Sequence, residues 1–459
     1  MTRIRTRGLG PGQRTGQEPL CYTLYDIVRD RLIKNDLEGL EHAFSSYTNE
    51  HDAVRQLGRA LFDEDISIRI KAAGKLLSLA EEKHSGISAA KPYLMRAINN
   101  RYIYVADRTA KTLGAIAPHE DISKAIPRLR RILNNDRYHA FGIQAALSGA
   151  VRNPLSKDAA VMVLREGLGS GCETIRRESA YALREAAWGG GDISGAFDSL
   201  VSTLGEKDPS IALHAANAFA YAAEKKADIS IAVSPLTKIV AERGHDELRL
   251  SAITALSHFS ENRGNISAAI TALGDVFQLG EQRHEAMEKA ATALKNAAIS
   301  GADISMTAYL LIGALSGNTE AVREQVRIAL IESLKNPKSH ETALEAIAHR
   351  IPDPDHETRS QLSRILVVSA RQGAEIDLII VKRAINDRVK ELRSSYGEKQ
   401  ATIAMIEAAG IYSVICNAAK ESKSRFFDGE NLESTIRPPS GYKNGMFRTG
   451  MAKSGIHAR

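Results

Sequence analysis

Asp228-Ile229-Ser230 is one copy of a short phrase that returns along the chain at nearly constant spacing. Identical copies begin at Asp121, Asp192 and Asp303, and close variants are Gly86-Ile87-Ser88 and Asn265-Ile266-Ser267. With Leu155 counted as the centre of one more copy, the central residues recur every 33 to 38 positions. Self-similarity at such a period is typical of a repeat array. The sequence therefore predicts a stack of similar units and not a set of domains with separate cores.

A second series of large apolar residues keeps the same period. We call this series the apolar ladder. Its members are Leu76, Leu113, Leu147, Leu183, Phe219, Leu256, Leu294, Leu330 and Leu366. Each unit contains two helical stretches, one beginning at the phrase and one following a short turn, with apolar residues at helical spacing. A lone pair of such helices cannot bury both apolar faces, so neighbouring pairs must stack. We predict an all-α, right-handed superhelix of about nine to ten two-helix repeats.

The phrase has a physical reason to recur at the start of each unit. Asp and Ser side chains can both accept hydrogen bonds from the unpaired N–H groups of a first helical turn. Either residue can therefore serve as the N-cap, and the sequence leaves that choice open. The central Ile is expected to be buried against the preceding helix.

The ends of the chain differ from its middle. We expect a basic N-terminal arm over residues 1–18 and a helical cap over residues 19–50. The repeats then occupy residues 51–390, followed by a second helical cap over residues 391–421. Residues 422–459 are rich in Gly, Pro, Ser and basic side chains, which predicts a disordered tail, and the N-terminal arm has the same character.

The positive charge of the chain is concentrated in its two tails. The whole chain carries a formal net charge of +6, while residues 1–17 contain four arginines and no acidic residue. Residues 437–459 contain five basic residues and no acidic residue, which leaves the body between them at −3. Basic, unstructured tails are candidates for contact with nucleic acid.

Cysteine usage and hydropathy bear on the compartment. The three cysteines lie far apart and form no CxxC pair, which argues against a disulfide framework and favours a reducing, cytoplasmic location. No apolar run approaches the ~20 residues that cross a bilayer, so we expect no contact with a membrane. The N-terminus lacks the apolar core of a secretory signal. Because it is rich in Arg and free of acidic residues, it is also compatible with import into an organelle.

The second helices carry a motif of a known class. Glu320-Ala321-Val322-Arg323, followed by Ala329-Leu330, resembles the repeats of HEAT and armadillo-like α-solenoids. Within that class the short HEAT units of phycobilisome-lyase-like proteins are the most similar, and the resemblance covers residues 51–390. It implies that an arginine seven residues before the buried ladder position pairs with a turn acid of an adjacent unit. The arginines at this position are Arg69, Arg176, Arg249, Arg323 and Arg359. The alternative is that these arginines form a row that binds phosphate groups.

Catalytic signatures are scarce. Four His-Glu pairs occur, at His119, His284, His340 and His356, and a HEAT-like hydroxylase family uses such pairs to hold iron. Their positions within the repeats differ, so the four pairs cannot converge on one metal. The chain has no P-loop, dinucleotide-binding glycine motif, nucleophile elbow or HExxH motif. We therefore predict that the protein is not an enzyme and needs no cofactor.

Three functional hypotheses remain. The first is a scaffold whose concave surface of second helices binds an extended protein partner. The second is an RNA- or ribosome-associated factor in which the basic tails make the contacts. The residues that would make those contacts are Arg3, Arg5, Arg7, Arg14, Lys443, Arg448 and Lys453. The third is an enzyme or chromophore lyase on the same scaffold, which would use Cys172 or His284.

Overall fold

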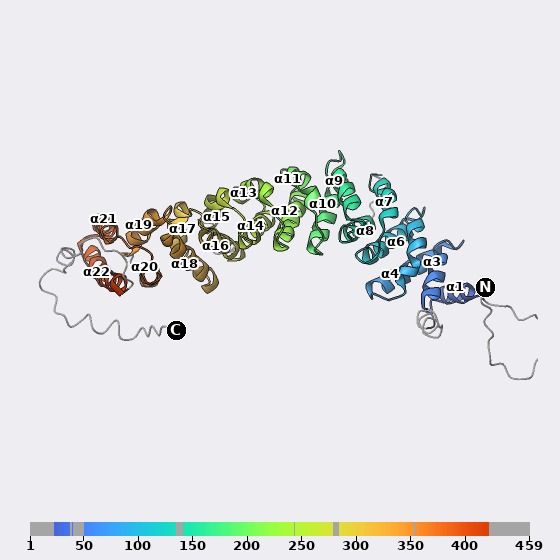
Figure 1. Ribbon diagram of the computed structural model, residues 1–459, viewed down its shortest axis with the longest axis horizontal. Helices are drawn as coiled ribbons and strands as arrows, with labels where there is room; N and C mark the ends of the chain where they lie inside the picture. The colour runs from blue at the N-terminus through green and yellow to red at the C-terminus, as the bar shows by residue number, and fades with distance from the viewer. Residues whose placement is uncertain are drawn as a thin grey trace, which may run out of the picture. The chain divides into compact units, whose positions relative to one another are not determined.

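The protein is an all-α solenoid of paired helices, seen here in a computed structural model that describes residues 23–36, 39, 50–134, 141–242, 244–278, 284–352 and 355–421 (Figure 1). No strand occurs in those ranges. The chain divides into two compact units, unit 1 (Met1–Pro235) and unit 2 (Leu236–Arg459). The basic tails that the sequence assigns to residues 1–18 and 422–459 lie outside the described residues. Half of the N-terminal cap expected over residues 19–50 does so too, and α1 is its main described element.

Unit 1 contains one leading helix and then five helix pairs within its described part. The leading helix is α1 (Leu24–Lys34). The pairs are α3 (Glu50–Ala60) with α4 (Ile66–Glu81), α5 (Lys91–Ala97) with α6 (Ile103–Ile116), α7 (Ile126–Leu133) with α8 (Phe141–Val151), α9 (Lys157–Leu168) with α10 (Glu173–Trp188), and α11 (Phe197–Thr203) with α12 (Pro209–Glu224). Each of the second helices α4, α6, α8 and α10 packs against the next second helix along the chain.

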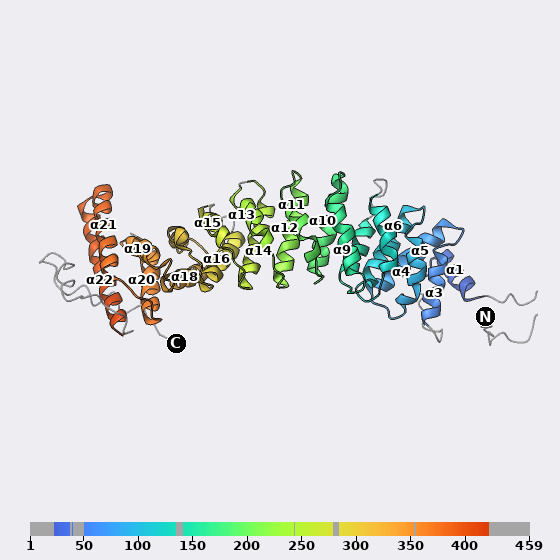
Figure 2. The same cartoon turned by 45° about the horizontal axis from the view of Figure 1, so that its top comes forward.

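Unit 2 also contains five pairs, and the first helix of its first pair crosses the division between the units. The pairs are α13 (Val233–Ala241) with α14 (Asp246–Glu261), α15 (Ile270–Asp275) with α16 (His284–Ile299), α17 (Ala308–Gly313) with α18 (Glu320–Lys335), α19 (His340–Arg350) with α20 (His356–Arg371), and α21 (Leu378–Tyr396) with α22 (Glu398–Glu421). Again each second helix packs against the next, and Figure 2 shows the pairs following one another. Helix α21 runs across residue 390, where the sequence places the start of a separate cap.

The core of both units is the predicted apolar ladder. All nine ladder residues, from Leu76 to Leu366, have no solvent-exposed surface. Between them lie small residues, mostly Ala, which let neighbouring helices approach closely. In α12, for example, Ala215, Ala216 and Ala218 are fully buried beside Phe219. The prediction that one helical register of large apolar residues forms the core is confirmed.

The Asp-Ile-Ser phrase begins a short 3₁₀ turn, and an α-helix follows it. Such turns are η2 (Ser123–Ala125), η3 (Ser194–Ala196), η4 (Ser230–Ala232), η5 (Ser267–Ala269) and η8 (Ser305–Thr307). In the four Asp-Ile-Ser copies the Asp Oδ1 accepts the Ser N–H at 2.8–3.0 Å. The Asp side chain thus bonds the first residue of the turn, while the central Ile occupies the N-cap position itself. The central Ile is at most 1% exposed in every one of these copies.

Leu155 does not belong to this series. It is 75% exposed, whereas Asn153 and Ser156 of its turn are buried, and the Ser156 hydroxyl donates to the Ala150 carbonyl at 2.9 Å. The reason is a different turn, Asn153-Pro154-Leu155-Ser156, in which the Asn153 Oδ1 accepts the Leu155 N–H at 2.9 Å. The expectation that Leu155 is equivalent to the buried isoleucines is wrong.

Among the described residues, the same variant turn occurs once in each unit, before the fourth helix pair. In unit 1 the Asn153 Nδ2 donates at 2.9 Å to the carbonyl of Ala117, at the end of α6. In unit 2 the Asn336 Nδ2 donates at 3.0 Å to the carbonyls of Gly301 and Ala302, just after α16. These carbonyls follow helix ends, where backbone acceptors lack helical partners. Each asparagine thus ties its own turn to the repeat before it.

One described helix is long and apolar enough to cross a membrane. Residues 401–418 of α22 have a mean hydropathy of 1.4, and a third of them are buried. The expectation that no run reaches such a length is wrong here, because Glu407 is the one charged residue in this stretch. In the structure α22 packs against α20 and α21, and Glu407 pairs with Arg359 at 3.0 Å. The end helix of a helical stack can have this composition, so the segment assigns no membrane role.

Candidate functional site

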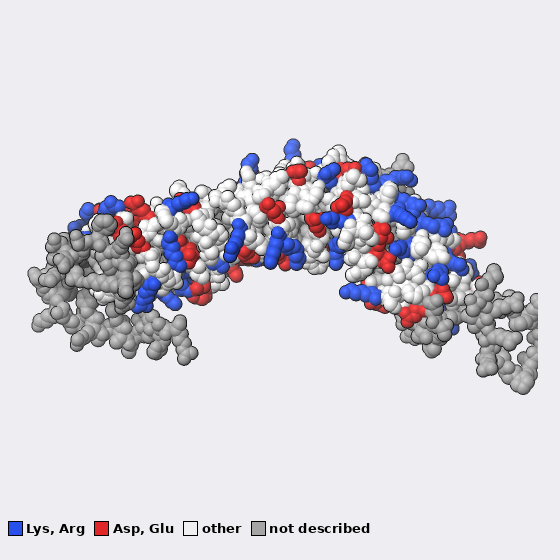
Figure 3. Space-filling model, in the orientation of Figure 1, with Lys and Arg blue, Asp and Glu red and all other residues white. Residues whose placement is uncertain are grey.

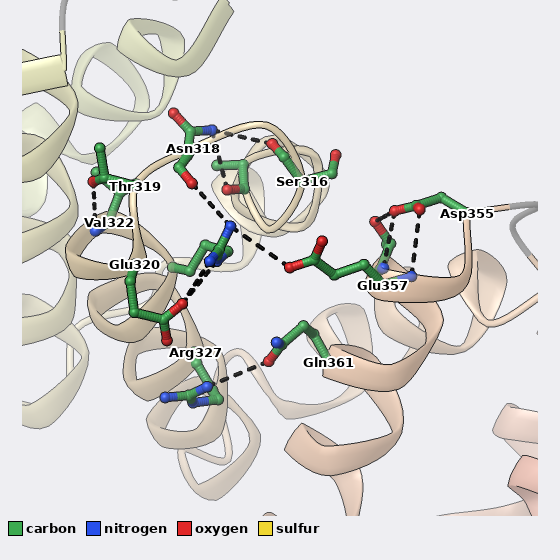
Figure 4. A network of polar contacts seen from close by, with 12 residues as sticks. Ser316, Asn318, Thr319, Glu320, Val322, Arg327, Asp355, Glu357 and Gln361 are labelled. Atoms are coloured by element: carbon green, nitrogen blue, oxygen red, sulfur yellow. Dashed lines mark hydrogen bonds and ion pairs between the residues drawn. The ribbon is translucent and has the colours of Figure 1, made fainter. Parts of the chain in front are cut away.

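The arginines seven residues before the ladder positions contact groups in the loops between helices and in the next repeat. Arg323 of α18 is one example, and Figure 4 shows its partners Asn318, Glu320 and Glu357 close together between two successive repeats. Its guanidinium lies 2.6 Å from Glu320, donates at 3.0 Å to the Asn318 carbonyl, and lies 3.6 Å from Glu357 of the next repeat. Nearby, the Arg327 Nη1 donates to Gln361 of α20 at 3.3 Å. Arg323 therefore links its own turn with the following helix pair.

The other arginines of this position have related but unequal surroundings. Arg176 contacts Glu206 of the next repeat at 2.8 Å, and Arg359 contacts Glu407 of α22 at 3.0 Å. The Arg69 Nε donates to the carbonyl of Asp63 in its own turn, and its guanidinium lies over the ring of Tyr102, 5.4 Å from the centroid. Arg249 is 5% exposed within α14. Side chains held in this way do not form an accessible row for phosphates.

The histidines of the His-Glu pairs lie on separate elements. His284, His340 and His356 begin α16, α19 and α20, and His119 follows α6. Across the described ranges, no three His, Cys, Asp or Glu residues come close enough together to hold a metal ion. The acid of one pair, Glu357, instead faces Arg323 at 3.6 Å.

The strongest candidate site in the described part lies on α10 and α12 of unit 1. There the Arg184 guanidinium lies over the Tyr181 ring, 4.3 Å from its centroid, and 2.6 Å from the Glu185 carboxylate. Its Nη1 is also 3.2 Å from the Nδ1 of His214, which comes from α12. The Tyr181 and His214 rings meet edge to face with centroids 5.4 Å apart. We call these four residues and Trp188 the aromatic cluster.

Trp188 extends the aromatic cluster along the surface. It stands seven residues after Tyr181, and positions seven apart lie on the same face of a helix. Its side chain is 64% exposed, which is unusual for the one tryptophan of a chain of 459 residues. Exposed aromatic side chains beside an arginine are the composition of protein-binding hot spots. The aromatic cluster can offer apolar area, a cation and a carboxylate to a partner.

His214 is uncharged in this cluster at neutral pH. Burial, together with the positive charges of Arg184 and Arg177, lowers the pKa of His214 to about 4. The neutral ring can accept a hydrogen bond from Arg184, which a protonated ring cannot.

We predict that the ring of His214 titrates near pH 4 in a proton NMR titration, well below the usual value of 6.5 for histidine. Between these two values the unfolded chain binds a proton that the folded chain does not, so the free energy of unfolding falls as the pH falls through this window. His214→Asn should remove that part of the pH dependence, and the difference between variant and wild type isolates it from titrating carboxylates. A titration midpoint near 6.5 would contradict the described packing of the ring.

Sequence reasoning missed the aromatic cluster, although a signal was present. The spacing Tyr181, Glu185, Trp188 marks one face of α10. Gly189-Gly190-Gly191 follows α10, and Gly190 has a φ of +83°, in the left-handed region that suits glycine. The pairing with His214 joins residues 30 positions apart and depends on how α10 and α12 are rotated against each other. The candidate nucleic-acid contacts of the two tails all lie outside the described residues.

Comparisons with known proteins do not place the chain in a family. No protein-family model matches it, and no curated protein matches it. One solved structure, from work on a phosphorylation switch that controls the interaction between cadherin and beta-catenin, shares 13% identity over 89% of this chain and 93% of its own, with a TM-score of 0.43. Another, an engineered protein, shares 18% identity over 64% of this chain and 97% of its own, with a TM-score of 0.31. Both are too distant to inform the function of this chain.

Proposed function

We propose that the protein is a non-catalytic scaffold that binds a protein partner through the second-helix face of unit 1, with the aromatic cluster as the main contact. The observation that carries this proposal is the exposed Trp188 beside the preorganised group of Tyr181, Arg184 and His214. Residues of this kind dominate the binding energy of protein interfaces. Because Arg184 is already held by Tyr181 and Glu185, little side-chain entropy is lost when a partner docks.

The setting supports this proposal. Successive second helices pack side by side along unit 1, so an extended partner can follow several repeats. We also propose that the repeats are of the short two-helix HEAT type, since each consists of two helices and Arg323 joins successive pairs. Cys172 and Cys416 form no disulfide, in keeping with a reducing compartment such as the cytoplasm.

The decisive test compares Trp188→Ala with wild type. Tagged full-length protein is purified from its native cells with and without nuclease, and the associated proteins are quantified by mass spectrometry. We expect Trp188→Ala to lower recovery of the nuclease-resistant partner at least tenfold, because truncating a hot-spot residue costs about 2 kcal/mol or more. The melting temperature should stay unchanged, since Trp188 is 64% exposed.

Leu155→Ala is the matched control, because Leu155 is an apolar residue of unit 1 that is 75% exposed and lies outside the cluster. It should leave partner recovery unchanged. Equal recovery with Trp188→Ala and wild type would reject the aromatic cluster as the binding site. Loss of all associated proteins after nuclease treatment would reject the protein scaffold in favour of an RNA-bound factor.

A further inference from the structure

A second surface of unit 1 carries an excess of positive charge. Residues 91–134 contain nine Lys or Arg and three Asp or Glu, which gives this stretch +6 within a body of −3. Four of these residues, Arg96 on α5 and Lys124, Arg128 and Arg131 on η2 and α7, form what we call the basic edge. The last three stand four and three residues apart, so they share one side of the segment. Figure 3 shows basic side chains gathered over the part of unit 1 where α6 and α7 lie.

The acids around the basic edge neutralise it only in part. Glu120 is paired with Lys91, and Glu166 lies 2.8 Å from Arg130. Asp121, which accepts the Ser123 N–H at 2.8 Å, interacts electrostatically with both Lys91 and Lys124 but forms no ion pair with Lys124. Within the described ranges no carboxylate lies at ion-pair distance from Arg96, Lys124 or Arg131, all of which are exposed. Arg176, Arg323 and Arg359 elsewhere in the chain do have such partners. Uncompensated like charges repel one another, and an anionic partner relieves that repulsion.

Two of the four side chains are held in place. The Arg128 Nη1 donates at 2.7 Å to the carbonyl of Met95, which brings α7 against the end of α5. The neighbouring residue Arg96 lies over the ring of Phe62, 5.0 Å from its centroid. A guanidinium fixed on one side keeps its remaining N–H donors for a carboxylate, and its ordering cost is already met by the fold.

We propose that the basic edge binds a short, extended, acidic polypeptide segment of a partner protein. Two features favour this occupant over a nucleic acid. Two of the nearby aromatic rings are engaged, since Arg96 covers Phe62 and both Arg69 and Arg101 lie against Tyr102. Tyr104 of α6 is 70% exposed, and one ring is a smaller platform than the successive stacked bases of a single strand need. The charge is also local. Outside residues 91–134 the body carries −9, so a long polyanion would run onto acidic surface.

The test measures binding of a fluorescein-labelled twelve-residue Glu/Asp peptide to the full-length protein by fluorescence anisotropy. The comparison probes are the matching Gln/Asn peptide and a twelve-nucleotide oligouridine. Arg96→Glu, Arg128→Glu and Arg131→Glu are combined in one variant. The control variant combines Lys207→Glu, Lys225→Glu and Lys238→Glu, which are exposed and give the same change in net charge. Both variants keep the basic tails, so their difference reports on the basic edge alone.

We expect the wild-type protein to bind the acidic peptide at least tenfold more tightly than the neutral peptide and the oligouridine. The basic-edge variant should lose at least tenfold in affinity, and the control variant less than twofold. Trp188→Ala should bind the acidic peptide as wild type does, which separates this site from the aromatic cluster. Equal losses in the two triple variants would assign the binding to net charge and overturn the proposal, and unchanged binding in both would assign it to the tails and overturn it as well. Tighter binding of the oligouridine would identify a nucleic-acid surface and overturn it too.

Discussion

Gly114→Ala is expected to destabilise unit 1 by about 2 kcal/mol, although alanine is the better helix former. Gly114 lies inside α6, where a Cβ atom would overlap the backbone carbonyl of Ala145 in α8. A second contact of the same kind exists at Gly149 of α8, whose Cβ would meet the carbonyl of Gly114. Backbone atoms of two packed helices cannot move aside as a flexible side chain can. The overlap therefore outweighs the gain of about 1 kcal/mol that alanine brings to a helix interior.

Amide hydrogen exchange across α6 and α8 measures this effect locally, which suits a repeat protein because unfolding of such arrays need not be two-state. Gly74→Ala is the matched control. Gly74 is also inside a second helix, but the nearest atom to its Cβ would be the end of the Arg108 side chain, at 3.4 Å. We expect this control to stabilise α4 by up to about 1 kcal/mol. If Gly114→Ala and Gly74→Ala both raised local stability, or both lowered it, backbone contact between α6 and α8 would not be what limits the residue at position 114.

Asn153→Ala is expected to lower the free energy of unfolding by about 2–3 kcal/mol, because two hydrogen bonds are lost at a site that is 5% exposed. The substitution leaves the buried Ala117 carbonyl without the Asn153 donor and the Leu155 N–H without its acceptor. Asp228→Ala is the control, because Asp228 is exposed and accepts the N–H two residues on, as Asn153 does, but within the described residues makes no second bond to the preceding repeat. Its loss should cost about 1 kcal/mol or less.

Urea denaturation followed by circular dichroism, together with hydrogen exchange at the end of α6, measures both variants. The exchange data should show faster opening at the α6 end in Asn153→Ala and no change there in Asp228→Ala. Equal costs for the two substitutions would mean that the link from Asn153 back to Ala117 adds nothing to the capping of the turn.

The periodic features of the fold were predictable from sequence, and the contacts between repeats were not. Leu113 and Phe219 could be assigned to the core because one residue per period must fill the space between stacked pairs, and both are fully buried. Leu155 was misassigned because its turn contains Asn153-Pro154 and buries a serine hydroxyl instead of an isoleucine side chain. The period reports where a turn falls and not which hydrogen bonds close it.

The candidate sites were harder to predict for a related reason. The aromatic cluster depends on Arg184 reaching His214 across two helices, and the basic edge depends on Arg128 reaching Met95. Such pairs are set by the rotation and offset of neighbouring helices, which one sequence does not report. The arginines that the resemblance groups together also have different surroundings. Arg69 lies over the ring of Tyr102, whereas Arg176 forms an ion pair with Glu206.

The Asn-Pro-x-Ser turns add a longer spacing to the period of single repeats. Asn153 and Asn336 stand 183 residues apart, which corresponds to five repeats, and each stands just before the fourth of the five described helix pairs in its compact unit. At both places a side-chain amide bonds backbone carbonyls of the preceding repeat. The repeats are therefore not interchangeable, and equivalent substitutions at Asn153 and Asn336 act at corresponding places of the two units.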